Sequence, residues 1–256
     1  MSAEMKILAI LQARMSSSRL PGKVDREILG KPMLARQIER INRSTAIEKL
    51  VVATSTNPED DTVEAIARDA GVECFRGSLN DVLDRFYQCA LRYHPQWIIR
   101  LTGDCPLSDW RIIDAVAAFA IAGNHDYASN GKEPSFPDGL DVEVVKFQAL
   151  ETAWHEAVLA SDREHVLPFI HRQDGRFSIG NYRNGEDLSG LRWTVDEPAD
   201  LEFVRAVYSE LYEANPDFAF ADILRLLEKK PELATINGGF TRNEGYLKSL
   251  LRDKQV

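Results

Sequence analysis

The chain has 256 residues, of which 44% are hydrophobic and 28% charged, and its formal net charge is -9. This length and composition fit one large globular domain and exclude fibrous or low-complexity architectures. The negative charge disfavours a broad nucleic-acid-binding surface, so any site for an anion must be a small basic pocket.

Cysteine usage and hydropathy predict a cytoplasmic protein. Cys74, Cys89 and Cys105 are widely spaced and form no CxxC pair, which disfavours a zinc site or a disulfide framework. The first apolar run is one strand long and lacks a small-residue cleavage site, so it is not expected to be a signal peptide. No stretch approaches the roughly 20 apolar residues of a membrane span.

The first half of the chain alternates short apolar strands with amphipathic helices. Strands are expected within 6–11, 49–56, 72–78 and 97–107, and helices within 32–44, 60–71, 81–94 and 109–123. Such alternation favours parallel strands joined by right-handed crossovers. The expected fold class is therefore α/β, a three-layer α/β/α sandwich with a mostly parallel mixed sheet.

The pattern changes after residue 125. Further strands are expected at 126–130, 140–147, 176–183 and 191–197, with fewer helices between them, and the last fifty residues read as mostly helical. The strands predict an antiparallel or mixed extension of the sheet. With no linker and no internal repeat, we expect a single domain over 1–256, in which the segment around 130–190 forms a subdomain or dimer arm.

A basic loop, "QARMSSSRLPGK", follows the first strand. Ligands of open α/β sheets bind at the carboxyl ends of strands, where Arg14, Arg19 and Lys23 could donate to phosphate oxygens. The loop is neither a Walker A nor a GxGxxG motif. The alternative is a solvated basic loop closed by a Pro-Gly turn.

Two aspartates follow other predicted strands. Asp104 lies in "GDCP", and Asp196 follows the strand expected to end at Val195, with Pro198 opening a helix. Two carboxylates beside a phosphate-binding loop indicate Mg²⁺, which takes a few carboxylates plus phosphate oxygens. The alternatives are a turn-forming role for Asp104 and a helix cap for Asp196.

Five stretches together resemble one enzyme family: "ILAILQARMSSSRLPGKV", "LTGDCPL", "FPDGLDVEV", "DREHV" and "LRWTVDEPADLEFV". They look like the cytidylyltransferase family of CMP-sugar synthetases, in its spore-coat polysaccharide (SpsF-type) branch, related to the Kdo and acylneuraminate cytidylyltransferases. The resemblance runs from about residue 6 to 204, and "NEGYLKSL" near the C-terminus adds to it. It implies a nucleotide-diphospho-sugar transferase (GT-A-like) fold, and relatives that commonly pair through such an arm imply a homodimer.

The resemblance also implies a nucleotide site. It places CTP against a set of residues from the first loop and the GD string: Leu11, Ala13, Arg14, Ser18, Arg19, Lys23, Thr102 and Asp104. Mg²⁺ is implied at Asp104 and Asp196, and Arg14, Lys23 and Asp104 are the expected catalytic residues. Thr102 stands where Kdo enzymes have a glutamine that helps read cytosine, so base selection is expected from backbone groups around Leu11 to Arg14 or from other side chains. "RGSLNDVLDRF" resembles the family's ribose-contacting segment, but Ser78 with Asp81 also fits a helix capping box, which we favour.

A second polar cluster is the candidate acceptor site. Asp138 lies in a Pro-Asp-Gly turn, and period-two alternation puts Asp141 and Glu143 on one face of the next strand. Arg163 and His165 in "DREHV" are expected either as their partners within the fold or as contacts to an acceptor anion. The alternative for the whole cluster is an internal salt-bridge network.

The expected reaction is transfer of CMP from CTP to a sugar acid, sugar phosphate or similar acceptor, with release of pyrophosphate. Positioning and charge neutralisation would supply most of the catalysis. Two rivals stay open: a GT-A glycosyltransferase using a finished nucleotide sugar, although the D-x-D string of such enzymes is absent, and a non-catalytic nucleotide-binding module.

Overall fold

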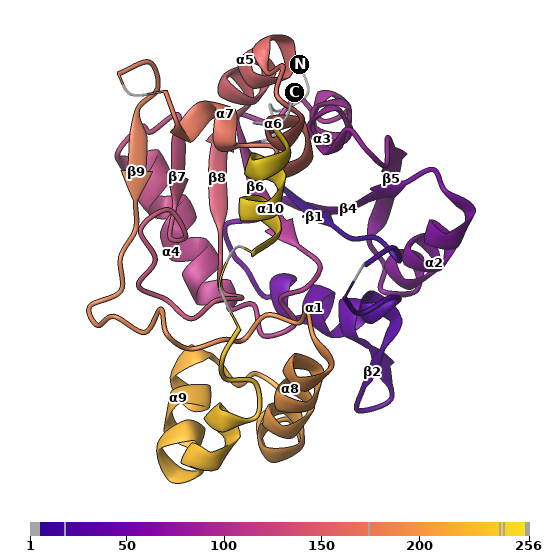
Figure 1. The fold of residues 1–256 in the computed structure, drawn as a ribbon, viewed down its shortest axis with the longest axis vertical. Coiled ribbons are helices and arrows are strands. Elements are labelled where there is room, and N and C mark those ends of the chain that lie inside the picture. The colour runs from indigo at the N-terminus through magenta and orange to yellow at the C-terminus, as the bar shows by residue number, and fades with distance from the viewer. Residues whose placement is uncertain (1–5, 18, 174, 241, 243, 254–256) are drawn as a thin grey trace.

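The computed structural model describes residues 6–17, 19–173, 175–240, 242 and 244–253. In this part of the chain, seven strands form one mixed sheet in the order β5-β4-β1-β6-β8-β7-β9 (Figure 1). Its first half consists of β1 (Ile7–Gln12), β4 (Lys49–Ser55), β5 (Glu73–Gly77) and β6 (Trp97–Thr102). These four strands are parallel, as the alternation of strands and helices predicts.

The second half of the sheet confirms the predicted mixed extension. β8 (Glu143–Lys146) pairs antiparallel with both β6 and β7 (Tyr127–Ser129), and β9 (Ile179–Asn181) pairs parallel with β7. A small hairpin of β2 (Glu27–Ile28) and β3 (Lys31–Pro32), which the sequence did not indicate, follows the first loop.

The strand expected at 191–197 is wrong. This segment is extended, but it makes only one isolated bridge, between Asp138 and Arg192. The N–H of Trp193 donates to the carbonyl of Asp138 at 2.6 Å, and the N–H of Val195 donates to the carbonyl of Asp104 at 2.7 Å. Because its hydrogen bonds go to two different loops, the segment ties those loops together and forms no continuous ladder.

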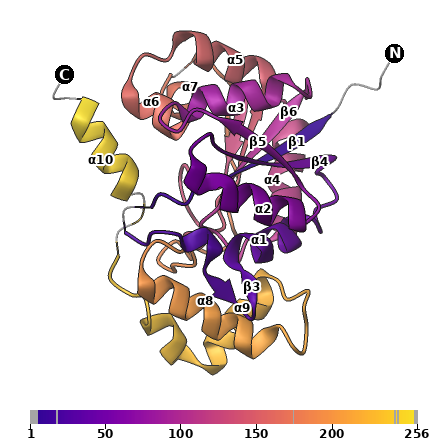
Figure 2. The ribbon, with the colours of Figure 1, turned by 90° about the vertical axis from the view of Figure 1, so that its right-hand side faces the viewer.

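Alternating residues of β1 pack into two cores on opposite faces of the sheet, as a pleated strand requires. Ala9 and Leu11 join the cluster formed with α1 (Met33–Ile41), α2 (Asp61–Asp69), α4 (Trp110–Ala122), α8 (Pro198–Leu211) and α9 (Phe220–Lys229). Leu8 and Ile10 join the cluster formed with α3 (Val82–Leu91), α5 (Phe147–Glu156) and α7 (Pro168–His171). α6 (Ala160–His165) packs against α3 and α7. Figure 2 shows the second group of helices together on one side of the sheet, which confirms the three-layer prediction.

Three helices, α5, α6 and α7, were not predicted from the sequence. α5, α6 and α7 occupy much of 147–171, where fewer helices were expected. α3 ends at Leu91, earlier than the predicted 94. α8, α9, a 3-10 turn (Pro231–Thr235) and α10 (Glu244–Asp253) confirm the helical C-terminal part. None of the helices in the described ranges is long and apolar enough to cross a membrane.

Candidate active site

A cavity of about 750 Å³ opens at the carboxyl ends of β1 and β6. Its lining comes from the loops after these strands, from β7 and β8, from α6 and from α10. Gly103 lets the two loops approach each other: its N–H donates to the carbonyl of Gln12 at 2.7 Å. A Cβ at this position would lie 2.9 Å from both that oxygen and the Cβ of Ala13. The GD string therefore needs glycine for close packing.

Lys23 joins the two predicted metal-binding aspartates. Its Nζ lies 2.8 Å from Asp196 Oδ1 and 3.4 Å from Asp104 Oδ2, and it donates to the carbonyl of Val195 at 2.8 Å. Burial disfavours the ammonium, but the two carboxylates outweigh it and raise the pKa of Lys23. Burial likewise opposes the charge of Asp104, yet Lys23 and hydrogen bonds lower the pKa of this carboxyl to about 2. Lys23 and Asp104 are therefore both charged at neutral pH.

Asp196 is not the cap of α8. The N-cap is Glu197, which forms a capping box with Asp200. The carboxylate of Asp196 instead faces the first loop, where Arg19 Nη2 lies 2.6 Å from Asp196 Oδ2. Arg19 also contacts Glu244 of α10 at 3.1 Å. The helix-cap alternative for Asp196 is therefore excluded by the geometry.

Arg14 and Arg85 supply positive charge without carboxylate partners. Both line the cavity, and within the described residues Arg14 makes no hydrogen bond or ion pair. Arg85 is 2% exposed and its Nε has no partner. Burial and the neighbouring Arg14 lower the pKa of Arg85 to about 10. Two neighbouring cations that lack counter-ions form a site suited to an anion.

Arg85 is a cavity residue that the sequence motifs did not indicate, although it lies inside "RGSLNDVLDRF". The available signal was an arginine between Leu83 and Phe86, on the apolar face of a predicted helix. Ser78 and Asp81 of the same stretch do not line the cavity. Asp81 caps α3 by accepting from Asp84 N at 2.9 Å, and Ser78 Oγ accepts from Asp81 N at 3.0 Å. The prediction of a helix cap in this stretch is confirmed, but the predicted capping box is wrong, because Asp81 and not Ser78 is the N-cap of α3.

The structure brings most of the predicted nucleotide residues to the cavity. The lining includes Ala13, Arg14, Arg19, Lys23, Thr102 and Asp104. Leu11 is an exception, because its side chain is fully buried in the sheet core and does not reach the cavity. Ser18 lies outside the described residues.

Asp138, Asp141 and Glu143, the acids of the predicted acceptor cluster, line the cavity, each with an arginine partner. Asp138 lies 3.0 Å from Arg192 Nη1, Asp141 pairs with Arg242, and Glu143 pairs with Arg100. Glu143 also accepts from the Tyr127 hydroxyl at 2.8 Å. Burial and the neighbouring Asp141 raise the pKa of Asp138 to about 6. β8 begins only at Glu143, so Asp141 lies just before the strand.

The prediction that Arg163 faces this cluster is wrong. Arg163 Nη2 lies 2.6 Å from Asp81, and Nη1 donates to the carbonyl of Trp154 at 2.8 Å, away from the cavity. Arg163 thus braces the start of α3 against α5 and α6. Spacing along the chain did not reveal Arg100, Arg192 and Arg242, which the fold brings to the acids instead.

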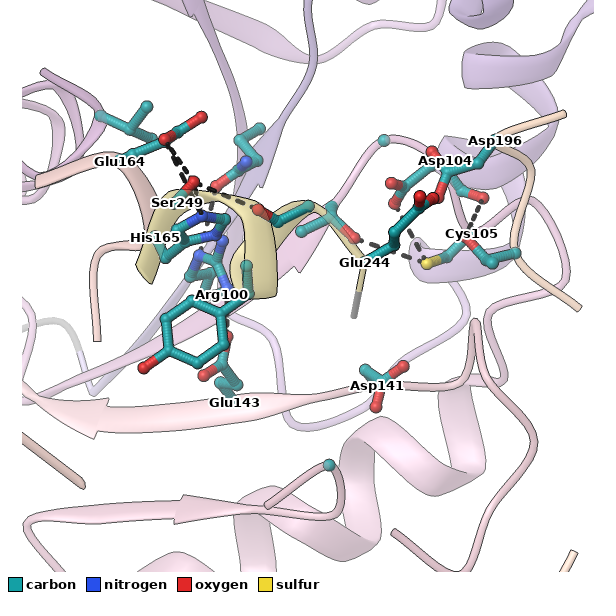
Figure 3. Close-up of a pocket in the computed structure, with 18 of the residues that line it drawn as sticks. Arg100, Asp104, Cys105, Asp141, Glu143, Glu164, His165, Asp196, Glu244 and Ser249 are labelled. Carbon is teal, nitrogen blue, oxygen red and sulfur yellow. Dashed lines mark hydrogen bonds and ion pairs between the residues drawn. The ribbon is translucent and has the colours of Figure 1, made fainter. Parts of the chain in front are cut away.

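His165, in contrast, does line the cavity. Its Nε2 lies 3.0 Å from Ser249 Oγ of α10, and the ring of Tyr246 meets the imidazole edge-on at 5.1 Å between centroids. Burial lowers the pKa of His165. Figure 3 shows His165 beside Arg100, with Glu244 at the other end of α10 pointing toward Asp104 and Asp196.

The carboxylates of Asp104 and Asp196 fit a hard cation only in part. Within the described ranges, no group of three or more His, Cys, Asp or Glu side chains is arranged to hold a metal ion. Two hard oxygen donors at one edge of the cavity match a Mg²⁺ site completed by phosphate oxygens of a bound nucleotide.

Comparison with known proteins identifies the family of this chain. The model of a family described as cytidylyltransferase matches residues 8–233. The chain belongs to the cytidylyltransferase family. It is 34% identical to the spore coat polysaccharide biosynthesis protein SpsF of Bacillus subtilis, over 90% of this chain and 97% of that protein. It is 36% identical to the 3-deoxy-manno-octulosonate cytidylyltransferase of Syntrophotalea carbinolica, over 92% of this chain and 88% of the relative.

A solved structure extends the likeness to three dimensions. A cytidylyltransferase from Leptospira borgpetersenii superposes with a TM-score of 0.87 at 32% identity, covering 93% of this chain and all of the other. These matches confirm the family and the fold expected from the sequence.

Proposed function

We propose that this cytidylyltransferase transfers CMP from CTP to a sugar acid, sugar phosphate or similar acceptor and releases pyrophosphate, in the synthesis of a surface polysaccharide precursor. The observation that carries the proposal is the position of Arg14 and Arg85, two cations that have no counter-ion among the described residues, beside the Lys23–Asp104–Asp196 cluster. Arg14 and Arg85 on one wall of the cavity can therefore bind a negatively charged triphosphate. Asp104 and Asp196 at the adjacent edge can bind the cation that accompanies the triphosphate.

Each group then has a defined task. Arg14, Arg85 and Arg19 bind phosphate oxygens, and Lys23 holds Asp104 and Asp196 close together. Asp104 and Asp196 would hold Mg²⁺, which when bound would neutralise phosphate charge and lower the pKa of the acceptor oxygen. A hydroxyl acceptor first loses its proton to water, whereas an ionised phosphate or carboxylate acceptor has none to lose. The acceptor oxygen then bonds to the α-phosphorus, the bond from that phosphorus to the oxygen shared with the β-phosphate breaks, and pyrophosphate leaves with that oxygen beside the arginines.

The acceptor would lie against β7, β8 and α6. Asp138, Asp141 and Glu143 are paired with arginines but still border the cavity, so their oxygens can accept hydrogen bonds from hydroxyl or amino groups. The relatives are named for spore-coat polysaccharide biosynthesis and for 3-deoxy-manno-octulosonate, which supports an acceptor that is a sugar derivative.

The decisive experiment measures pyrophosphate. The protein is incubated with Mg²⁺ and each of the four ribonucleoside triphosphates. The acceptor panel holds 3-deoxy-manno-octulosonate, N-acetylneuraminate, glucose 1-phosphate, glycerol 3-phosphate and 2-aminoethylphosphonate. Pyrophosphate that appears only with CTP and an acceptor supports the proposal. Release of free nucleoside diphosphate from a nucleotide sugar would favour the glycosyltransferase, and CTP binding without turnover would favour a silent binding module.

We also infer a homodimer, formed through the arm around 130–190, because the related enzymes that the sequence resembles pair in this way. β9, at the edge of the sheet, and α5–α7 belong to this segment. Sedimentation velocity at micromolar concentration tests the inference, and a monomer would contradict it.

A cytoplasmic location is the companion proposal. It is supported by the three cysteines, which form no disulfide in the described structure, and by the use of CTP as substrate. Fractionation of cells that express the full chain would test it.

A further inference from the structure

Helix α10 crosses the cavity with its polar side inward. Tyr246, Ser249 and Arg252 line the cavity, whereas Leu247 and Leu251 are 51% and 61% exposed on the other side of the helix. Figure 2 shows α10 standing away from the body of the fold, beside α6. A helix that only packs against a domain turns its apolar face inward, so this reversed arrangement indicates that the inner face serves a polar ligand.

The C-terminal half of α10 lies at the acceptor end of the cavity. Ser249 Oγ donates to Glu164 at 2.8 Å and lies 3.0 Å from His165 Nε2, and Tyr246 packs against the same imidazole. Figure 3 shows Ser249 and His165 near Arg100 and Glu143. Among the described side chains of the helix, Glu244 alone pairs with the phosphate loop, through Arg19.

The inner face also holds polar groups without partners. Within the described residues, neither the Tyr246 hydroxyl nor the Arg252 guanidinium makes a hydrogen bond or ion pair. The acids that line the same cavity already have partners, because Arg192, Arg242 and Arg100 pair with Asp138, Asp141 and Glu143. The Tyr246 hydroxyl and the Arg252 guanidinium are therefore available as hydrogen-bond donors at this end of the cavity.

We propose that the inner face of α10 is an acceptor-recognition wall, in which Tyr246 and Arg252 contact a hydroxyl and an anionic group of the acceptor. Ser249 is a positioning residue that fixes His165 against this wall. The inference rests on the proposed transfer to an acceptor and adds the residues that select it.

The test compares the two faces of one helix in the full-length protein. Tyr246→Phe removes only a hydroxyl, and Arg252→Gln removes only a charge. Ser249→Ala removes the hydroxyl that lies against His165 Nε2. Leu251→Gln on the exposed outer face is the matched control. Each variant is first checked for unchanged helix content and melting temperature by circular dichroism. The CTP Kd is then measured by calorimetry, and the acceptor KM by pyrophosphate release with the five acceptors named above.

The inner-face variants should each raise the acceptor KM about tenfold, as expected for losing one hydrogen bond or charge contact, and should keep the CTP Kd within about twofold. Leu251→Gln should change neither constant. An active wild type whose inner-face variants keep the acceptor KM overturns this inference alone, and so does a CTP Kd that rises as much as the acceptor KM. A wild type that binds CTP but releases no pyrophosphate with any acceptor overturns the proposed function and, with it, this inference.

Discussion

The ammonium of Lys23 lies 2.8 Å from the carboxylate of Asp196, and the same nitrogen reaches Asp104 at 3.4 Å. One cation from the first loop therefore fixes two acidic groups that come from distant parts of the chain. The sequence indicated Lys23 as a phosphate ligand. In the structure its three donor positions are directed to Asp104, Asp196 and the carbonyl of Val195, so it also holds the predicted metal site in shape.

The two basic residues of the loop should consequently respond differently to removal. Lys23→Ala leaves two carboxylates facing each other and should lower the free energy of unfolding by on the order of 2 kcal/mol. Arg14→Ala breaks no hydrogen bond or ion pair within the described structure and should leave stability nearly unchanged. Both variants should lose roughly 2–4 kcal/mol of transition-state stabilisation as preorganised charge donors. Urea unfolding and steady-state turnover measure the two effects, and near-normal turnover in both variants would reduce the loop to solvated surface.

Substitutions of Asp196 and of its neighbour Glu197 should have different effects, because Asp196 is the predicted metal ligand and Glu197 is the N-cap of α8. Asp196→Asn should abolish Mg²⁺-dependent activity while leaving the fold intact, and Asp104→Asn should behave in the same way. Glu197→Ala removes the N-cap of α8 and should cost about 1 kcal/mol of stability with most activity kept. Melting curves and a magnesium titration of activity distinguish these outcomes. If Asp196→Asn lost stability alone, the metal role assigned to it would be wrong.

Asp138 should make stability depend on pH. Its pKa rises from 3.8 to about 6 on folding, because burial and Asp141 disfavour the carboxylate. Between these values the native state binds more protons than the unfolded state, so this group's contribution to stability falls as pH rises from about 4 to 6 and stays low above that. Asp138→Asn removes the titration and should gain stability relative to wild type over this range, by at most about 3 kcal/mol. Urea unfolding at pH 4, 5, 6 and 7 measures the difference, and a constant offset between the two proteins would contradict the assignment.

Glu244 should tune the affinity for the nucleotide. Its carboxylate lies 3.1 Å from Arg19 and competes with phosphate for that guanidinium. Glu244→Gln should therefore tighten CTP binding about two- to fivefold, the range expected of a partly exposed ion pair. Leu247→Gln on the exposed face of the same helix is the control. Calorimetric titration with CTP measures both, and weaker binding by the Glu244 variant would mean that this carboxylate supports the nucleotide site.

The sequence by itself determined the layered architecture, because the period of apolar residues switches between two and 3.6 where β1, α1, β4, α2 and their successors form. It also located the first loop and the GD string, since ligand-binding loops follow the carboxyl ends of parallel strands. These features depend on residues close together in the chain, so local spacing reveals them.

Only the tertiary structure decided which charges meet. Arg163 pairs with Asp81 and not with the acceptor acids, and those acids pair with Arg100, Arg192 and Arg242. The segment 191–197 has the composition of a strand, yet its hydrogen bonds go to two loops. Arg85 and the inner face of α10 reach the cavity from helices whose local sequence gives little sign of it. Such pairings are set by crossovers and helix packing between distant segments, and charge pairing is not encoded by spacing along the chain because any arginine can satisfy any nearby carboxylate.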